Sequence, residues 1–207
     1  MIWGGALGLA LLAASGAASA QTRNEVGLVM GATVTPSREL AAGPVSSLTI
    51  NPSLAMGLEY DRQVFSAGDT EFYLGGDFLA SPRDVKLSNP PPSVGHLYAY
   101  LFLTPHVRVK FNASGAFSPW LQVGGGYARF LEAVPATATN FTQGTNTGTL
   151  VFGGGVDSPP VFRVFGLAIG FRGEVRDFYS GSPNYGQPTS GSLQHNIALT
   201  GGFLVRF

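Results

Sequence analysis

From residue 24 onward, apolar and polar side chains alternate along short segments separated by stretches rich in Gly, Pro, Ser, Thr and Asn. The alternation is clearest at the end of the chain, where one face holds Ile197, Leu199, Phe203, Val205 and Phe207. A period of two residues is typical of β-strands whose two faces meet different surroundings. We therefore predict eight strands, over residues 24–34, 51–62, 71–82, 97–111, 119–133, 148–157, 163–179 and 194–207.

The connections between these segments alternate in length. Long polar connections follow the odd-numbered strands, at 35–50, 83–96, 134–147 and 180–193. Shorter ones follow the even-numbered strands, at 63–70, 112–118 and 158–162. An even number of antiparallel strands with long loops at one rim and short turns at the other is the layout of membrane barrels. We predict an all-β fold, a closed up-and-down transmembrane β-barrel of eight strands.

Two glycine runs and one arginine interrupt the pattern. The runs are Gly124–Gly126 and Gly153–Gly155, and Arg129 falls on the apolar face of the fifth segment. Glycine inside a strand marks a bulge, tight curvature or a place where a large neighbour needs room. We therefore predict a bulge or a local strand end near Arg129.

Composition decides which face of the strands points outward. Charged residues make up 12% of the chain, against roughly 25% in average globular proteins, which is too few to solvate a whole exterior. The formal net charge is zero, which argues against a nucleic-acid partner. A soluble barrel of lipocalin type, with its apolar face inside, is the alternative. Aromatic residues near the predicted strand ends favour a membrane barrel with interfacial girdles: Tyr60, Phe78, Tyr127, Phe130, Phe178, Tyr179 and Phe207.

The first 20 residues are predicted to be a cleaved signal peptide. They contain no charged side chain, and they end in Ala18-Ser19-Ala20, a small-x-small pattern that suits signal peptidase. Their apolar stretch is shorter than the roughly 20 residues that a spanning helix needs. The usual positive side chains at the start are missing, and an uncleaved anchor helix is the alternative. Residues 21–207 are then the barrel domain.

The alternating segments, the leader, PWLQVGGGYAR at 119–129 and GGFLVRF at 201–207 together resemble the small outer-membrane barrels of the outer-membrane protein A and opacity-protein type. The resemblance implies a bacterial outer-membrane location and a monomer surrounded by lipid and lipopolysaccharide. It also implies periplasmic chaperones and the barrel-assembly machinery as partners. The terminal Phe207, with Val205 and Phe203 before it, would then belong to the signal that this machinery reads.

Charged side chains on the polar face are candidates for the lumen. An eight-stranded barrel is just wide enough to be filled by side chains, and an unpaired buried charge is costly. We therefore expect paired acids and bases that plug the lumen, and a small-conductance pore is the alternative. The candidates are Glu59, Asp77, His106, Arg108, Arg172, Glu174 and Arg176, together with Lys110 and Gln122.

No pattern in the chain indicates catalysis. The chain has no cysteine, and no acid is spaced to orient His96 or His195. We expect no enzyme activity, no cofactor and no metal site, with a lipid A-modifying enzyme as the less favoured alternative. The expected role is structural or surface-binding, through the four long loops, where the side chains best suited to touch a partner are Arg38, Arg83, Lys86, Phe141 and Tyr185.

Overall fold

A computed structural model of the protein describes residues 24–39, 47–88, 95–133, 144–183 and 193–207. The predicted signal peptide and parts of the four long loops lie outside these ranges. Within the described ranges, no helix has the length and apolarity needed to cross a membrane.

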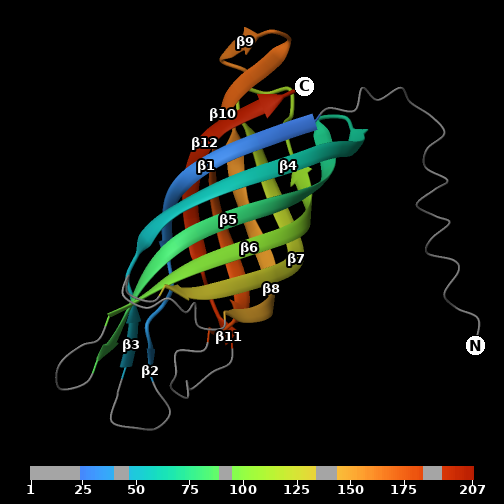
Figure 1. The fold of residues 1–207 in the computed structure, drawn as a ribbon. Coiled ribbons are helices and arrows are strands. Elements are labelled where there is room, and N and C mark those ends of the chain that lie inside the picture. Colours follow the sequence, from blue (N-terminus) through green and yellow to red (C-terminus); the bar gives the residue numbers. More distant parts are fainter. Residues whose placement is uncertain (1–23, 40–46, 89–94, 134–143, 184–192) are drawn as a thin grey trace, which may run out of the picture.

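Eight long antiparallel strands of the described chain close into a barrel (Figure 1). Each ring strand pairs with the ring strands before and after it in the sequence, and β1 pairs with β12 to complete the ring. This confirms the predicted fold. The ring consists of β1 (Asn24–Val34), β4 (Ser53–Ala67), β5 (Thr70–Ser88), β6 (Gly95–Lys110), β7 (Ser118–Ala133), β8 (Thr145–Asp157), β10 (Leu167–Gly181) and β12 (Ile197–Arg206).

In the described part of the chain, four short strands extend the ring at its two ends. At one end, which we call the loop rim, lie β2 (Arg38–Glu39), β3 (Ser47–Ile50) and β11 (Leu193–Gln194). At the opposite end, which we call the C-terminal rim, lie the start of β1, the end of the chain and β9 (Phe162–Val164). The backbones of Asn24 and Phe207 exchange hydrogen bonds of 2.8 and 3.0 Å there and close the seam.

The alternation in the sequence becomes an alternation of burial. Along β4, Leu58 is 52% exposed on the outer surface while its neighbour Glu59 is 1% exposed inside the barrel. The same exchange occurs on every ring strand, because successive side chains of a strand point to opposite faces. The prediction that the apolar face of the strands points outward is confirmed, and a lipocalin-like arrangement is excluded.

The irregularities lie elsewhere than predicted. The pairing of β7 with β6 and with β8 runs past Arg129 without a change of register, and Arg129 is exposed on the outer surface. The predicted bulge there is wrong. A register shift occurs instead between Gln63 and Phe65 on β4. The predicted connection 63–70 shrinks to the tight turn at Gly68, whose φ of 58° suits glycine.

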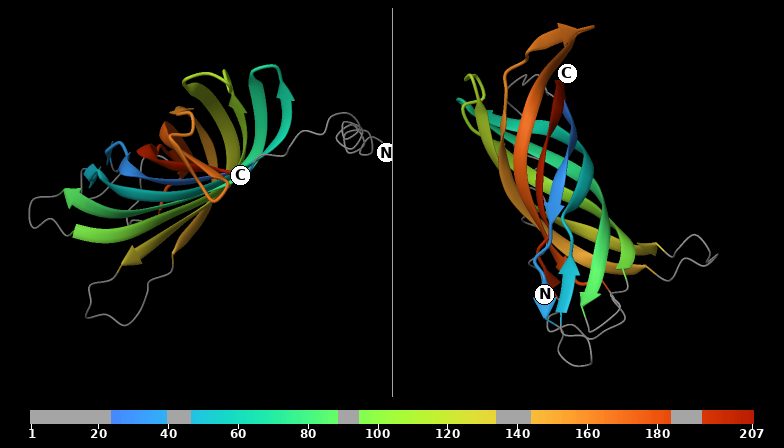
Figure 2. Two further views of the ribbon diagram at one scale, coloured as in Figure 1. Left: turned by 90° about the horizontal axis from the view of Figure 1, so that it is seen from above. Right: turned by 90° about the vertical axis from the view of Figure 1, so that its left-hand side faces the viewer.

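The seventh predicted strand also begins later than the sequence indicates. Residues 162–164 form β9, the chain reverses at Phe165 and Gly166, and β10 starts at Leu167. The connection from β8 to β10 is therefore a hairpin, which Figure 2 shows beyond the ends of the neighbouring strands. The period-two pattern continues through a hairpin turn, which is why the sequence reads as one strand.

Candidate functional site

The lumen near the C-terminal rim is filled by charged side chains that six ring strands supply. We call this group the lumenal charge network. Each of these residues occupies a position of its strand whose side chain points inward, so all of them meet inside the barrel. The network comprises Glu25, Glu59, Asp61, Asp77, His106, Arg108, Lys110, Asp157, Arg172, Glu174 and Arg176.

Arg172 on β10 joins three acids from three different strands. Its guanidinium contacts Glu59 at 2.5 Å, Asp157 at 2.7 and 2.9 Å, and Glu25 at 3.3 Å. Each of these charges is almost wholly buried, and a charge removed from water is tolerated only when it is well paired. Arg172 therefore fixes β1, β4 and β8 relative to β10.

Arg108 on β6 makes a second crossing of the lumen. It donates to Asp61 at 2.5 Å and to Glu59 at 3.1 Å, both from β4. It also donates to Gln122 on β7, whose amide donates to Asp77 at 2.8 Å. Because the partners lie on several strands, no pair in this region can separate without disturbing another.

The remaining members extend the network along the barrel axis. His106 lies between two aspartates, with Nε2 2.8 Å from Asp61 and Nδ1 3.2 Å from Asp77. Arg176 contacts Glu59, Asp77 and Glu174 at 2.9, 3.1 and 2.5 Å. These contacts bring β5 and the loop-side half of β10 into the same network.

Trp120 on β7 occupies the space between two guanidinium groups. Its ring centroid lies 4.1 Å from Cζ of Arg108 and 5.1 Å from Cζ of Arg172, and its indole N–H donates to Asp157 at 3.0 Å. A Cβ at Gly155, on the adjacent strand, would stand 2.5 Å from Cζ2 of this ring. The glycine therefore provides the room that the indole needs, as the sequence predicted for a glycine run.

A second layer, nearer the loop rim, is apolar and aromatic. We call it the aromatic layer. The ring centroids of Tyr100 and Phe130 are 4.5 Å apart, and those of Phe102 and Phe178 are 4.7 Å apart. Arg176 lies 5.5 Å from the centre of the Phe178 ring and joins this layer to the charges below. Its members are Tyr98, Tyr100, Phe102, Phe130 and Phe178, packed with smaller buried aliphatic residues.

All nine lumenal residues predicted from the sequence lie buried inside the barrel and contact one another or their neighbours. Four equally buried lumenal residues were not among these predictions: Glu25, Asp61, Trp120 and Asp157. Their parity would have revealed them, since each is an even number of residues from an inward-facing residue on its own strand.

Parity also corrects three predictions. Phe130 and Phe178 were predicted to lie in an outer girdle, but both are buried within the lumen, Phe178 with 0% exposure. Arg83 was predicted to reach out from a loop. It lies instead on an extended β5, buried, with Nη1 donating to the carbonyl of Thr33 at 2.9 Å. Phe141 and Tyr185, two other predicted loop contacts, lie outside the described residues.

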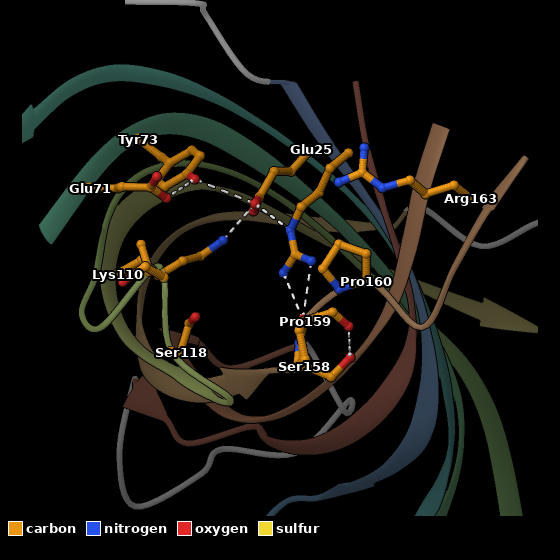
Figure 3. A pocket seen from close by; sticks show the side chains of 13 residues that line it. Glu25, Glu71, Tyr73, Lys110, Ser118, Ser158, Pro159, Pro160 and Arg163 are labelled. Carbon is orange, nitrogen blue, oxygen red and sulfur yellow. Dashed lines mark hydrogen bonds and ion pairs between the residues drawn. The ribbon is translucent and has the colours of Figure 1, made fainter. Parts of the chain in front are cut away.

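A pocket of about 210 Å³ opens at the C-terminal rim (Figure 3). On the wall of the pocket, the Glu25 carboxylate accepts hydrogen bonds from Lys110 at 2.6 Å and from Arg206 at 3.0 Å. The Tyr73 hydroxyl donates to Glu71 at 2.5 Å. The pocket thus ends at the lumenal charge network. Among the described side chains, no group of three or more His, Asp or Glu residues is placed to hold a metal ion.

At the loop rim the structure adds an acid that the spacing in the sequence did not reveal. Nδ1 of His195 lies 2.6 Å from Oδ2 of Asp177, and the His195 ring packs on Tyr179 with centroids 4.7 Å apart. The expectation that no acid orients this histidine is therefore wrong. The pair faces the outer surface, and the side chain of His96 lies outside the described residues.

Comparisons with solved structures agree with this architecture. The outer membrane protein OprG from Pseudomonas aeruginosa superposes with a TM-score of 0.56, at 14% identity, covering 90% of this chain and 96% of that one. Neisserial surface protein A superposes with a TM-score of 0.54, at 12% identity, covering 90% of this chain and 97% of that one. The chain folds as a small outer-membrane β-barrel. No family model and no curated protein matches the sequence of this barrel.

Proposed function

We propose that this protein is an integral outer-membrane barrel whose lumen is closed by its own side chains and which acts through its loops at the cell surface. The C-terminal rim then faces the periplasm and the loop rim faces outward, following the usual orientation of short turns and long loops. Lipid and lipopolysaccharide would surround the outer face. The observation that carries the proposal is the pair of layers stacked across one lumen, one of paired charges and one of aromatic rings.

Each layer opposes conduction for a different physical reason. In the charge network, the carboxylates and guanidinium groups are already paired with one another, so a passing ion must break buried ion pairs. In the aromatic layer, an ion would exchange much of its hydration for contact with apolar rings. The small-pore alternative requires both layers to open together.

Planar-bilayer recording tests this proposal. We expect the purified barrel to give no stable single-channel steps. A triple variant that truncates the aromatic layer, Tyr100→Ala, Phe130→Ala and Phe178→Ala, should stay closed because the charge network remains. Large and stable steps from the unaltered protein would overturn the plug. Membrane fractionation with heat-modifiable gel migration tests the location independently, and a soluble protein without that shift would refute it.

We further propose that Phe203, Val205 and Phe207 form the signal read by the barrel-assembly machinery, with periplasmic chaperones as earlier partners. All three share the outward parity of β12, and the rings of Phe203 and Phe207 are about half exposed. An outward row at the seam strand is accessible to a partner before the barrel closes. A Phe203→Ser variant should accumulate unassembled in cells, whereas Ile197→Ser, outward at the other end of β12, should assemble normally.

A lipid A-modifying activity is the second candidate, and only the Asp177–His195 pair favours it. A carboxylate that orients a histidine is the arrangement used by general bases. Mass spectrometry of lipid A from cells with the unaltered protein and with His195→Ala decides between the two. Under the closed-barrel proposal the two lipid A profiles are the same, and the enzyme alternative requires them to differ.

A further inference from the structure

The β9–β10 hairpin carries a surface that the lumen and the loops do not account for. Most of its side chains are apolar and exposed, and it stands beyond the neighbouring strands at the C-terminal rim (Figures 1 and 2). Clusters of exposed apolar side chains on this scale mark contact surfaces. The exposed members are Val161, Phe162, Val164, Phe165 and Leu167.

The hairpin continues the two faces of the barrel wall. Phe162 pairs with Ile169 and Val164 pairs with Leu167, so all four share the outward parity of β10. Arg163 pairs with Ala168, which has inward parity, and Arg163 lines the pocket at the mouth of the barrel (Figure 3). The hairpin is therefore apolar on the outside and polar over the mouth.

The apolar face of the hairpin joins the outer surface of the barrel without a break. Next to Ile169 on the outward face of β10 comes Phe171, whose ring contacts Phe203 of β12 with centroids 5.5 Å apart. Phe207 is 53% exposed beside them. A surface continuous with the apolar belt of the barrel has the same surroundings as that belt unless the membrane ends before it.

At the tip of the hairpin, an aromatic residue adopts a backbone conformation that such residues usually avoid. Phe165 has a φ of 50° and is 100% exposed, and Gly166 follows with a φ of 83°. A bulky residue in the left-handed region is uncommon, and Asn, Asp or Gly is preferred at such turns. A fully exposed Phe adds nothing to packing in water, whereas aromatic rings are favoured where a membrane meets water.

We propose that the β9–β10 hairpin inserts its apolar face and the Phe165 ring into the interfacial region of the periplasmic leaflet, and so anchors this side of the barrel to phospholipid. The proposal rests on the proposed membrane location, since the belt with which the hairpin is continuous must itself face lipid. Burial of apolar side chains at the headgroup boundary supplies the attraction.

Site-specific labelling tests the lipid contact. The chain has no cysteine, so single-cysteine variants can carry an environment-sensitive fluorophore in vesicles of phosphatidylcholine and phosphatidylethanolamine. Phe165→Cys and Phe162→Cys probe the hairpin. Ala116→Cys, exposed in the connection from β6 to β7 at the same rim, is the matched aqueous control. Leu199→Cys, 62% exposed on the belt, is the lipid control.

We expect the labels at 162 and 165 to be quenched by lipids brominated near the headgroup, with emission at shorter wavelength than the label at 116. Iodide in water should quench only the label at 116. If the label at 199 contacts lipid but the label at 165 behaves like that at 116, the hairpin proposal fails alone. If the label at 199 is also quenched only by iodide, the membrane proposal fails too. Protection at 165 that depends on protein concentration would indicate a second copy and would equally overturn lipid anchoring.

Discussion

Arg172 offers the sharpest test of the lumenal charge network, and Arg172→Met is the perturbation. Methionine keeps much of the length of the side chain but removes the charge and every donor. The carboxylates of Glu25, Glu59 and Asp157 then lose the guanidinium that lies between 2.5 and 3.3 Å from each of them. An uncompensated charge in the barrel interior is the expected source of the instability.

The magnitude follows from what remains. Removing one partner of a buried ion pair costs about 3–5 kcal/mol. Glu59 keeps Arg108 and Arg176, at 3.1 and 2.9 Å, and Asp157 keeps Lys110 at 2.9 Å. The loss should therefore fall at the lower end, about 3 kcal/mol in the free energy of unfolding. This corresponds to about a hundredfold change in the unfolding equilibrium.

Urea titration of the barrel in lipid vesicles measures this loss. Trp120 is the natural probe, because the other tryptophan, Trp3, lies in the predicted leader. Arg163→Met on exposed β9 is the matched control and should change stability by less than about 0.5 kcal/mol. Adding Asp157→Asn to Arg172→Met removes one surplus negative charge and should restore part of the stability. If Arg172→Met unfolds like the Arg163→Met control, the reasoning on coupled buried pairs is refuted.

Three further substitutions test the packing and the seam. Gly155→Ala brings a Cβ within 2.5 Å of the Trp120 ring and should lower the free energy of unfolding by about 1–3 kcal/mol through overpacking. Its control is Gly148→Ala on the same strand, whose Cβ meets nothing within 4 Å and which should leave the urea midpoint unchanged. Phe178→Ala empties a fully buried site and should cost about 3–5 kcal/mol; a midpoint equal to that of the unaltered barrel would contradict the aromatic layer. Phe207→Ser keeps the backbone hydrogen bonds to the first strand, so the refolded barrel should keep its stability. Its assembly in cells, measured by gel shift, should decrease. Assembly equal to that of the unaltered protein would show that this residue is not part of the signal.

Much of the fold could be predicted because a membrane barrel has only two environments for side chains. Alternation located all eight ring strands, and β1 was predicted with both of its ends, at Asn24 and Val34. Strand ends were missed where backbone pairing continues past the residues that alternate clearly. On β5, for example, pairing continues to Ser88. The β9–β10 turn at Phe165 was missed because its aromatic residue is untypical of turns.

The candidate site could be predicted only in part, for a geometric reason. Parity states whether a side chain points inward but not at what height along the barrel it meets another strand. Glu59 and Arg172 are 113 residues apart in sequence yet in contact, because the tilt and stagger of the strands bring them to one level. The contact of Asp177 with His195, which lies just before β12, likewise follows from the β10–β12 register that brings Asp177 opposite Ile197. The spacing of residues along the sequence does not encode it.

The division of the lumen into two layers follows from one strand. Inward-facing residues of β6 run from Tyr98, Tyr100 and Phe102 at the loop rim to His106, Arg108 and Lys110 at the other end. A single strand thus changes from aromatic to cationic along its inner face, and other strands supply rings at the first level and carboxylates at the second. Since both layers span the same lumen, weakening one leaves the other in place. The truncated aromatic variant and Arg172→Met should therefore both lower stability while neither opens a conducting path.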